Sequence, residues 1–275
     1  MNDPHVVALF YTIEHDKSVN YEKAKPLVRD EPEFRVKVKN KKVYFKLKGH
    51  YATEPEARQS VKEYIRIWEL DAGLKRDPDF FKLKFDRAKI VDRNPTPGSV
   101  DAASITVKVT TSAATGTITP PDYPPPPSGL SIDADVQTMY ERYMNYCRKR
   151  EPLPSMAYFC LTILEGAAMA KTKGKFKKHE KRQAAAEYYH IEEKVLKLVG
   201  KLSSEKGDPL EARKREGPDD DLEKKERRFK EQERRFLEEA VKKMIYRAAE
   251  EIKVEKTNNP TKNLCQITLS DLPSV

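Results

Sequence analysis

Cysteine is scarce in this chain, and its spacing limits the chemistry that the protein can perform. The three cysteines, Cys147, Cys160 and Cys265, lie far apart in a sequence of 275 residues. They form neither a disulfide framework nor the paired CxxC spacing of a structural zinc site. A reducing compartment is therefore expected, and we predict a cytoplasmic protein.

Glycine is also scarce, with ten residues in all. No GxxxxGK[ST] motif is present and no GxGxxG follows a predicted strand, which argues against a loop that cradles phosphates. The sequence also lacks a GxSxG elbow, an HExxH motif and a paired Cys/His cluster. We therefore expect no cofactor, no metal and no catalytic residue, and favour a non-enzymatic protein.

Long hydrophobic runs are few. Val6–Ile13 is apolar but has no basic segment before it and no small-residue cleavage site after it, so we interpret it as a strand rather than a signal peptide. The most apolar window, Met156–Ala170, has 15 residues and contains Glu165. This length is too short to span a bilayer, and no membrane association is expected.

Basic residues exceed acidic ones along the whole chain. The formal net charge is +9, and residues 1–118 carry 22 Lys and Arg against 17 Asp and Glu. The excess is thus shared between the two parts of the chain rather than concentrated in a basic tail. It is a mild indication of binding to a polyanion.

Proline is concentrated in one place. Six of the 19 prolines lie in the eleven residues Thr119–Gly129, TPPDYPPPPSG. Proline fixes φ and has no N–H to donate, so this run cannot enter a helix or the interior of a sheet, and it predicts a stiff polyproline II spacer. We predict a sheet domain over 1–118, a helical domain over 130–255, and a tail over 256–275 that contains a short strand.

The N-terminal module has the period-2 pattern of strands. Val6–Ile13 is apolar on both parities, which indicates a strand covered on both faces or a central strand. Phe34–Lys48 reads as two alternating runs joined by a polar turn at Asn40-Lys41-Lys42, which is the pattern of a hairpin. Two further strands are predicted at Phe80–Phe85 and Ser104–Val109.

A single helix is predicted between these strands. Thr53 is a suitable N-cap, with Glu56 completing a capping box and Pro55 in the first turn. Apolar residues then recur at helical spacing, with Trp68 as the expected anchor. The fold class is predicted to be α+β, with an antiparallel or mixed sheet covered on one face by this helix and followed by a helical bundle.

The other face of the sheet is expected to be exposed and rich in lysine. It collects the polar residues of the predicted hairpin: Arg35, Lys37, Lys39, Lys42, Tyr44, Lys46 and Lys48. One interpretation is that the lysines only solvate an exposed sheet and protect its edges. The other is a platform for nucleic acid or another polyanion, with Arg35, Lys37, Lys46 and Lys48 as binding residues and Tyr44 as the one aromatic candidate for stacking.

The second module has the 3.6-residue pattern of helices. Asp133 or Asp135 can cap a helix that runs to about Arg150. The next helix, beginning at Ser155, is apolar nearly all round and is predicted to lie at the centre of a bundle. Glu165 within it is either a surface residue at the helix end or a buried carboxylate with a partner.

Positive charge is densest after that helix. Twelve residues carry seven cations: Lys171, Lys173, Lys175, Lys177, Lys178, Lys181 and Arg182. Gly174 predicts a loop there, so these cations are the second candidate for polyanion binding. The next residues have the spacing of two short helices meeting near His190, which fits a packed αα-hairpin or a DNA-reading helix-turn-helix. Glu192 and Glu193 argue against the latter, because phosphates repel carboxylates.

A long terminal helix is predicted from Asp220 to about Lys253, with a solvent-exposed first half and a second half packed on the bundle. After it, Leu264–Leu269 alternates apolar and polar residues. An isolated strand is not stable, and a bundle is expected to offer no sheet edge. We therefore predict that this segment pairs with the N-terminal sheet or with the edge of another chain, which would make it a site for a protein partner.

These features predict a non-enzymatic two-domain binding or adaptor protein that contacts nucleic acid through basic surfaces. A metal-dependent nuclease or another hydrolase is the alternative from the enzyme class, and a protein scaffold without nucleic-acid contact is the third. Salt-dependent retention on nucleic acid would support the first, since neutralised phosphates release counterions. Metal-stimulated cleavage would support the second.

Overall fold

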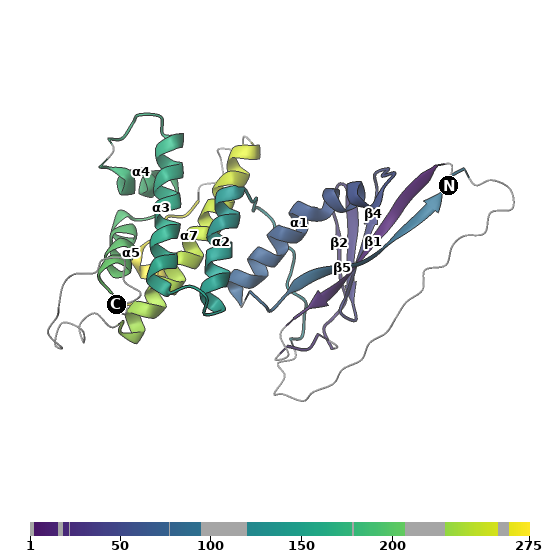
Figure 1. Ribbon diagram of the computed structural model, residues 1–275, viewed down its shortest axis with the longest axis horizontal. Coiled ribbons are helices and arrows are strands. Elements are labelled where there is room, and N and C mark those ends of the chain that lie inside the picture. The colour runs from purple at the N-terminus through teal and green to yellow at the C-terminus, as the bar shows by residue number, and fades with distance from the viewer. Residues whose placement is uncertain are drawn as a thin grey trace. The chain divides into compact units, whose positions relative to one another are not determined.

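The computed structural model divides the chain into two compact units, Met1–Pro127 and Ser128–Val275 (Figure 1). It describes most of each unit, over residues 3–15, 19–21, 23–76, 78–94, 120–177, 179–206, 229–257 and 264–275. The first unit contains a sheet and a helix and the second contains helices, which confirms the α+β fold class predicted from the sequence.

The first unit is built on a five-stranded sheet with the order β2-β3-β4-β1-β5, in which every neighbouring pair is antiparallel. Its strands are β1 (Pro4–Glu14), β2 (Leu27–Asp30), β3 (Phe34–Lys39), β4 (Lys42–Leu47) and β5 (Lys82–Asp92). The apolar strand β1 lies between β4 and β5, as expected for an interior strand. β2 was not predicted, because its four residues LVRD carry almost no alternation.

The predicted hairpin is confirmed, with a tighter turn than expected. β3 and β4 pair from Phe34 with Leu47 to Lys39 with Lys42, so only Asn40 and Lys41 connect them. Both have positive φ, 52° and 60°. That is the type I′ geometry whose twist matches the two strands, and asparagine tolerates it better than most residues.

Helix α1 (Glu54–Lys75) covers one face of the sheet (Figure 1). Thr53 and Glu56 form the predicted capping box, with Pro55 in the first turn. Buried Val61 and Trp68 lie on the stripe that packs against the strands. Among the described residues of the first unit α1 is the one α-helix, so within this unit no described helix lies on the other face of the sheet.

β5 is longer than the predicted Phe80–Phe85 strand. It runs to Asp92 and pairs with β1 along its length. The pairing register shifts at Asp86, since Tyr11 pairs with Phe85 and Phe10 with Arg87, and this irregularity breaks the alternation on which the prediction relied. The strand predicted at Ser104–Val109 lies outside the described residues.

The proline-rich segment packs on the first unit rather than forming a free spacer along its whole length. The N–H of Lys25 donates to Pro121 O at 3.0 Å, and the indole N–H of Trp68 donates to Pro124 O at 3.0 Å. Proline lacks a donor but keeps its carbonyl acceptor. The boundary between the units accordingly falls after Pro127, inside the predicted spacer.

Tyr123 fixes this segment to the sheet. It is 2% exposed and its ring stacks on Tyr21 with centroids 5.3 Å apart. Its hydroxyl accepts from the hairpin N–H of Lys41 at 3.2 Å and donates to Tyr21 O at 3.3 Å. The Tyr123 hydroxyl therefore joins the β3–β4 turn, the loop at Tyr21 and the proline-rich segment.

The second unit contains five helices among its described residues: α2 (Ala134–Cys147), α3 (Leu153–Lys171), α4 (Lys181–Tyr188), α5 (Glu193–Glu205) and α7 (Glu231–Thr257). Asp133 caps α2, as predicted, by accepting from Val136 N at 2.8 Å. α3 contacts each of the other four, which confirms its central position. The predicted start of the last helix at Asp220 lies outside the described residues.

α3 is longer than the 15-residue apolar window noted in the sequence. It has 19 residues and begins at Leu153, with Pro154 in its first turn. By length and composition alone it could cross a membrane, a test that the core helix of a soluble protein also passes. Eight of its residues are buried within the unit.

Of the two alternatives given for Glu165, a surface residue or a buried carboxylate with a partner, the structure shows the carboxylate with a partner. Its carboxylate accepts from Arg182 Nε at 3.1 Å and its side chain is 17% exposed. The guanidinium of Arg182 lies so close to Gly200 that a Cβ there would be 2.2 Å from Nη2. Glycine at 200 thus makes room for the ion pair, which joins α3 to α4 against α5.

α4 and α5 form an αα-hairpin around His190, whose φ is +50°. The C-terminal segment pairs with this turn: Glu192 N donates to Ile267 O at 2.8 Å, and Ile267 N donates to His190 O at 2.9 Å. The expectation that the bundle offers no partner for Leu264–Leu269 was therefore wrong. A non-helical turn has free backbone groups, and the segment makes a single parallel bridge there before a 3₁₀ turn at Leu269–Asp271.

Arg247 of α7 holds the turn and the tail together. Its guanidinium donates to Tyr189 O at 3.1 Å, to His190 O at 3.2 Å and to Cys265 O at 2.6 Å. Nε donates to Glu250 at 3.1 Å. The residue is 6% exposed, so its positive charge is compensated by these four acceptors.

Replacing Tyr123 by Phe is expected to destabilise the first unit by about 1–3 kcal/mol, because Lys41 N–H and Tyr21 C=O lose their partner in a partly buried place. Trp68 is the only tryptophan, so its fluorescence during urea unfolding of the whole chain reports on this unit. Tyr44→Phe is the matched control. An equal effect of both substitutions would contradict the role given to Tyr123.

Replacing Arg247 by Met is expected to destabilise the second unit by about 3 kcal/mol, because three carbonyls and Glu250 lose a buried donor. Hydrogen exchange at the amides of Glu192 and Ile267 should become faster. The control is Arg235→Met, whose ion pair with Glu231 is 67% exposed on each side and contributes little. Unchanged protection of Ile267 in the Arg247 variant would show that the tail is held by other contacts.

Candidate nucleic-acid interface

The uncovered face of the sheet is organised in three rows that cross the strands. Paired residues of antiparallel strands place their side chains on the same face. Across β3, β4, β1 and β5 the rows are Arg35–Lys46–Ala8–Lys89, Lys37–Tyr44–Phe10–Arg87 and Lys39–Lys42–Thr12–Lys84, and β2 adds Asp30 beside Arg35 and Val28 beside Lys37. We call the eight cations and two aromatic residues of these rows the basic face.

Positive charges on the basic face stand directly beside one another. Arg35 pairs with Lys46, and Lys39 pairs with Lys42, across the β3–β4 hairpin. Like charges at directly opposed positions destabilise a sheet. Asp30 of β2 stands beside Arg35 and offsets the charge of the first row, whereas on β3 and β4 the third row has only Lys39 and Lys42.

Two aromatic rings lie in the middle row. Phe10 of β1 and Tyr44 of β4 are half-buried neighbours, with ring centroids 5.1 Å apart. The guanidinium of Arg87 lies over the Phe10 ring, 4.6 Å from its centroid. The centre of the face therefore combines two half-buried rings with an arginine that covers one side of Phe10.

Most of the charge on β3 and β4 is not neutralised within the protein. Among the described residues, no carboxylate oxygen lies within ion-pair distance of Lys37, Lys39, Lys42 or Lys46, and all four side chains are exposed. On β5, the Lys84 ammonium lies 2.9 Å from Glu14, which raises the pKa of Lys84, and Arg87 lies 3.6 Å from Asp86. The positive charge that is left without a carboxylate partner among the described residues is therefore that of the exposed lysines of β3 and β4.

Three of the four sheet residues predicted to bind lie together on this face, and the fourth is already paired with a carboxylate. Arg35, Lys37 and Lys46 are adjacent in the rows. Lys48 is held at 2.5 Å from Asp30 and donates to Glu31 O at 2.7 Å. This contact holds the pKa of the Asp30 carboxyl below its usual range, so Lys48 is already paired.

The basic segment after α3 is partly neutralised. Lys171 lies 2.7 Å from Glu255, Lys175 pairs with Glu187, and Arg182 pairs with Glu165. Three other described cations of the segment form no ion pair with a described residue: Lys173, Lys177 and Lys181. Lys178 lies outside the described residues. Half of the described cations in this segment therefore hold helices of the bundle together.

Sequence reasoning missed the contribution of β1 and β5. Phe10 could not be assigned to a face because β1 is apolar on both parities, although Ala8 and Thr12 on the same parity are smaller or more polar than Leu9 and Ile13. Arg87 and Lys89 lie beyond the point where the alternation of β5 ends. Their place on the face depends on the register shift, which no local pattern indicates.

No metal cluster accompanies this face. In the part of the chain that the structure describes, no group of three or more His, Cys, Asp or Glu side chains could hold a metal ion. The described histidines form one pair, His5 and His50, with Nδ1 atoms 3.0 Å apart and stacked rings. This pair lies at the end of β1, next to Asp3.

Comparisons of the chain with protein-family models, with curated proteins and with solved structures found no match. The class of the protein is therefore the one that its own fold defines, an α+β sheet unit followed by a helical unit.

The His5–His50 pair should make the stability of the first unit depend on pH. Burial of His5, and then the nearby Arg93 and His50, lower the pKa of His5 below its usual value of 6.5, against an opposing effect of Asp3. The unfolded chain then binds the proton more readily, so stability is present above about pH 6.5 and falls as the pH drops below it.

Trp68 fluorescence during urea unfolding at pH 7.5 and pH 5.0 measures this dependence. The His5→Gln variant should show a smaller loss of stability between the two pH values than the unmodified chain. His179→Gln, at an exposed position of the second unit, is the control. An identical pH dependence in all three proteins would exclude His5 as the titrating group.

Proposed function

We propose that this protein binds single-stranded nucleic acid on the basic face of its N-terminal sheet. The observation that carries the proposal is the middle row, in which Tyr44 and Phe10 lie between Lys37 and Arg87. Stacking aromatic side chains together with cations that follow a phosphate backbone are what single-strand binding requires. No base-specific hydrogen bond is needed for this mode.

The spacing of the face suits an extended strand. Successive rows are two residues apart along each strand, a distance of about 7 Å, and neighbouring strands lie about 4.8 Å apart. A chain of nucleotides running along the strand direction would cross all three rows and would find cations in each row and aromatic rings in the middle one. An open sheet face suits single strands, whose bases can be splayed out, rather than entry into a duplex groove.

The cations after α3 provide a weaker candidate surface. Lys173, Lys177 and Lys181 are exposed, and Phe176 lies among them with the Lys175 ammonium 5.4 Å from its ring centroid, but this single ring has no aromatic partner like that of Phe10 and Tyr44 in the described residues. The proposal therefore places the binding energy on the sheet. The same three lysines then supply a charge-matched control.

The test measures fluorescence anisotropy of a labelled 12-nucleotide oligothymidylate with the whole protein at several salt concentrations. The variant Lys37→Gln/Lys42→Gln/Lys46→Gln should bind more weakly. Its slope of log affinity against log salt should be smaller by about 2, since each phosphate contact on a single strand contributes about 0.7. The control, Lys173→Gln/Lys177→Gln/Lys181→Gln, removes the same charge from the other unit and should leave affinity and slope nearly unchanged.

Tyr44→Ala tests the stacking component separately. Loss of one stacked base weakens binding by about 1–3 kcal/mol with little change in the salt slope, because no charge is removed. Equal effects of the two triple variants, or no salt-dependent binding by the unmodified protein, would overturn the proposal.

A further inference from the structure

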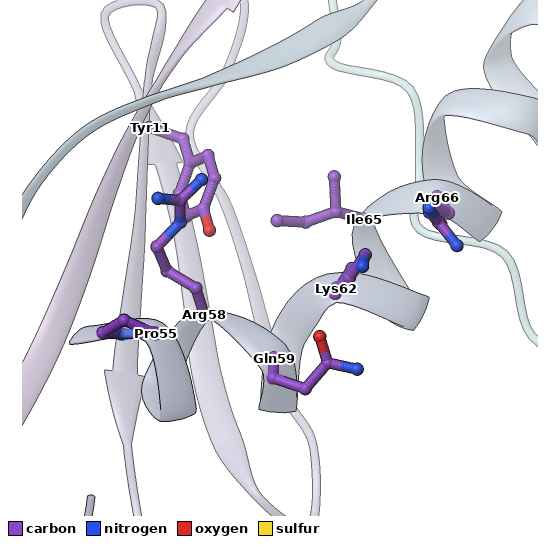
Figure 2. Close-up of a pocket in the computed structure, with 7 residues that line it drawn as sticks. All are labelled: Tyr11, Pro55, Arg58, Gln59, Lys62, Ile65 and Arg66. Atoms are coloured by element: carbon purple, nitrogen blue, oxygen red, sulfur yellow. The ribbon is translucent and has the colours of Figure 1, made fainter. Parts of the chain in front are cut away.

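A separate groove lies on the helix-covered side of the sheet. It has a volume of about 320 Å³ and is lined by residues of α1 and by one residue of β1: Tyr11, Pro55, Arg58, Gln59, Lys62, Ile65 and Arg66 (Figure 2). This volume is at the lower end of the range for small-molecule pockets. The lining combines an apolar wall with three cations.

The apolar wall is rigid. Tyr11 is 6% exposed, and its ring makes edge contacts with Phe45 and Phe85 at centroid distances of 5.5 Å each. Ile65 is also buried and points into the same space as the Tyr11 ring (Figure 2). A ring or aliphatic body entering the groove would meet side chains that are already fixed by the core.

Arg58 is oriented before any ligand arrives. Its guanidinium lies over the Phe85 ring, 4.3 Å from the centroid. Its ion pair with Glu54 is long, at 3.4 Å, and is exposed. Figure 2 shows the Arg58 side chain alongside the Tyr11 ring. A preorganised guanidinium loses little freedom when it binds an anion.

Tyr11 adds a hydroxyl donor to this charge. Burial raises the pKa of Tyr11, while Arg58 acts in the opposite direction, so the phenol keeps its proton at neutral pH. Within the described ranges, the Tyr11 hydroxyl donates to no protein acceptor. A ligand oxygen placed beside Arg58 could accept that hydrogen bond.

Lys62 and Arg66 extend the positive charge along α1. They follow Arg58 at intervals of four residues, so the three cations lie on one side of the helix. Both are exposed, and among the residues that the structure describes no carboxylate oxygen forms an ion pair with either. The groove therefore presents three cationic side chains and one hydroxyl donor beside an apolar wall.

We infer that this groove binds a small organic phosphate whose body is a flat aromatic ring. The ring would pack against Tyr11 and Ile65, and the phosphate oxygens would accept hydrogen bonds from Arg58, the Tyr11 hydroxyl and Lys62 or Arg66. A phosphate fits better than a carboxylate because it carries up to two charges and three acceptor oxygens. The site is distinct from the basic face and does not rest on the proposed function.

The test follows the Ile65 methyl and Tyr11 ring resonances by NMR in the whole protein during titration with phenyl phosphate. Saturable shifts are expected, with affinity at least about tenfold above that for inorganic phosphate or phenol alone, since each probe lacks one half of the ligand. Absence of saturable shifts at both residues would overturn the inference.

The Lys62→Gln/Arg66→Gln variant should bind phenyl phosphate about tenfold more weakly and retain its fold, because both side chains are exposed. Lys46→Gln/Lys89→Gln removes the same charge from the basic face and should bind normally. A normal affinity of the first variant, or an equal loss in both, would also contradict the site.

Two further competition experiments distinguish a free nucleotide from the end of a nucleic-acid strand as the ligand. Adenosine monophosphate represents a free nucleotide, and a 5′-phosphorylated oligothymidylate represents the end of a strand, with the 5′-hydroxyl strand as its control. Displacement of phenyl phosphate by the monophosphate alone indicates a free ligand. Displacement by the phosphorylated strand but not by its hydroxyl control indicates a strand terminus, and either result supports the groove as the binding site.

Discussion

One helix covers only one face of a five-stranded sheet, and the chemistry of the first unit follows from this constraint. On the covered side, Trp68 and the apolar residues of the strands exclude water and form the core. On the other side, the side chains of the strands face solvent and must be compatible with it. The chain places lysine and arginine there and keeps two aromatic rings, Phe10 and Tyr44, at the centre. A second helix on this face would have removed the surface on which the proposed function depends.

Cations in the two units illustrate how similar sequence features acquire different roles. Arg182 and Arg247 are held among acceptors that join helices, turn and tail of the second unit. Lys37 and Lys46 lie on a sheet face where no carboxylate of the described chain reaches them. The difference comes from geometry. Helices that pack side by side bring Glu and Arg of separate segments together. A strand pair fixes which residues are neighbours, and the side chains on the outer face of the sheet then point into solvent.

The two ligand surfaces that we propose share the sheet but use opposite sides of it. Tyr11 points toward α1 and Phe10 away from it, because successive residues of a strand alternate between faces. Arg58 over Phe85 and Arg87 over Phe10 repeat the same cation–ring contact on either side. In each case a half-buried aromatic residue fixes the direction of a surface arginine, which is how a small domain obtains preorganised positive charge without a buried ion.

Sequence alone determined the elements whose signals are local. The capping box of Thr53 and Glu56, the hairpin around Asn40, the central apolar helix and the αα-hairpin at His190 all follow from spacing and turn chemistry. Tertiary structure decided what depends on contacts between distant residues: the docking of Tyr123 on the sheet, the pairing of Ile267 with a helical turn, and the place of Phe10 in a basic row. Period and propensity describe neighbours along the chain, whereas hydrogen-bond partners and strand register are set by segments that meet only when the chain is folded.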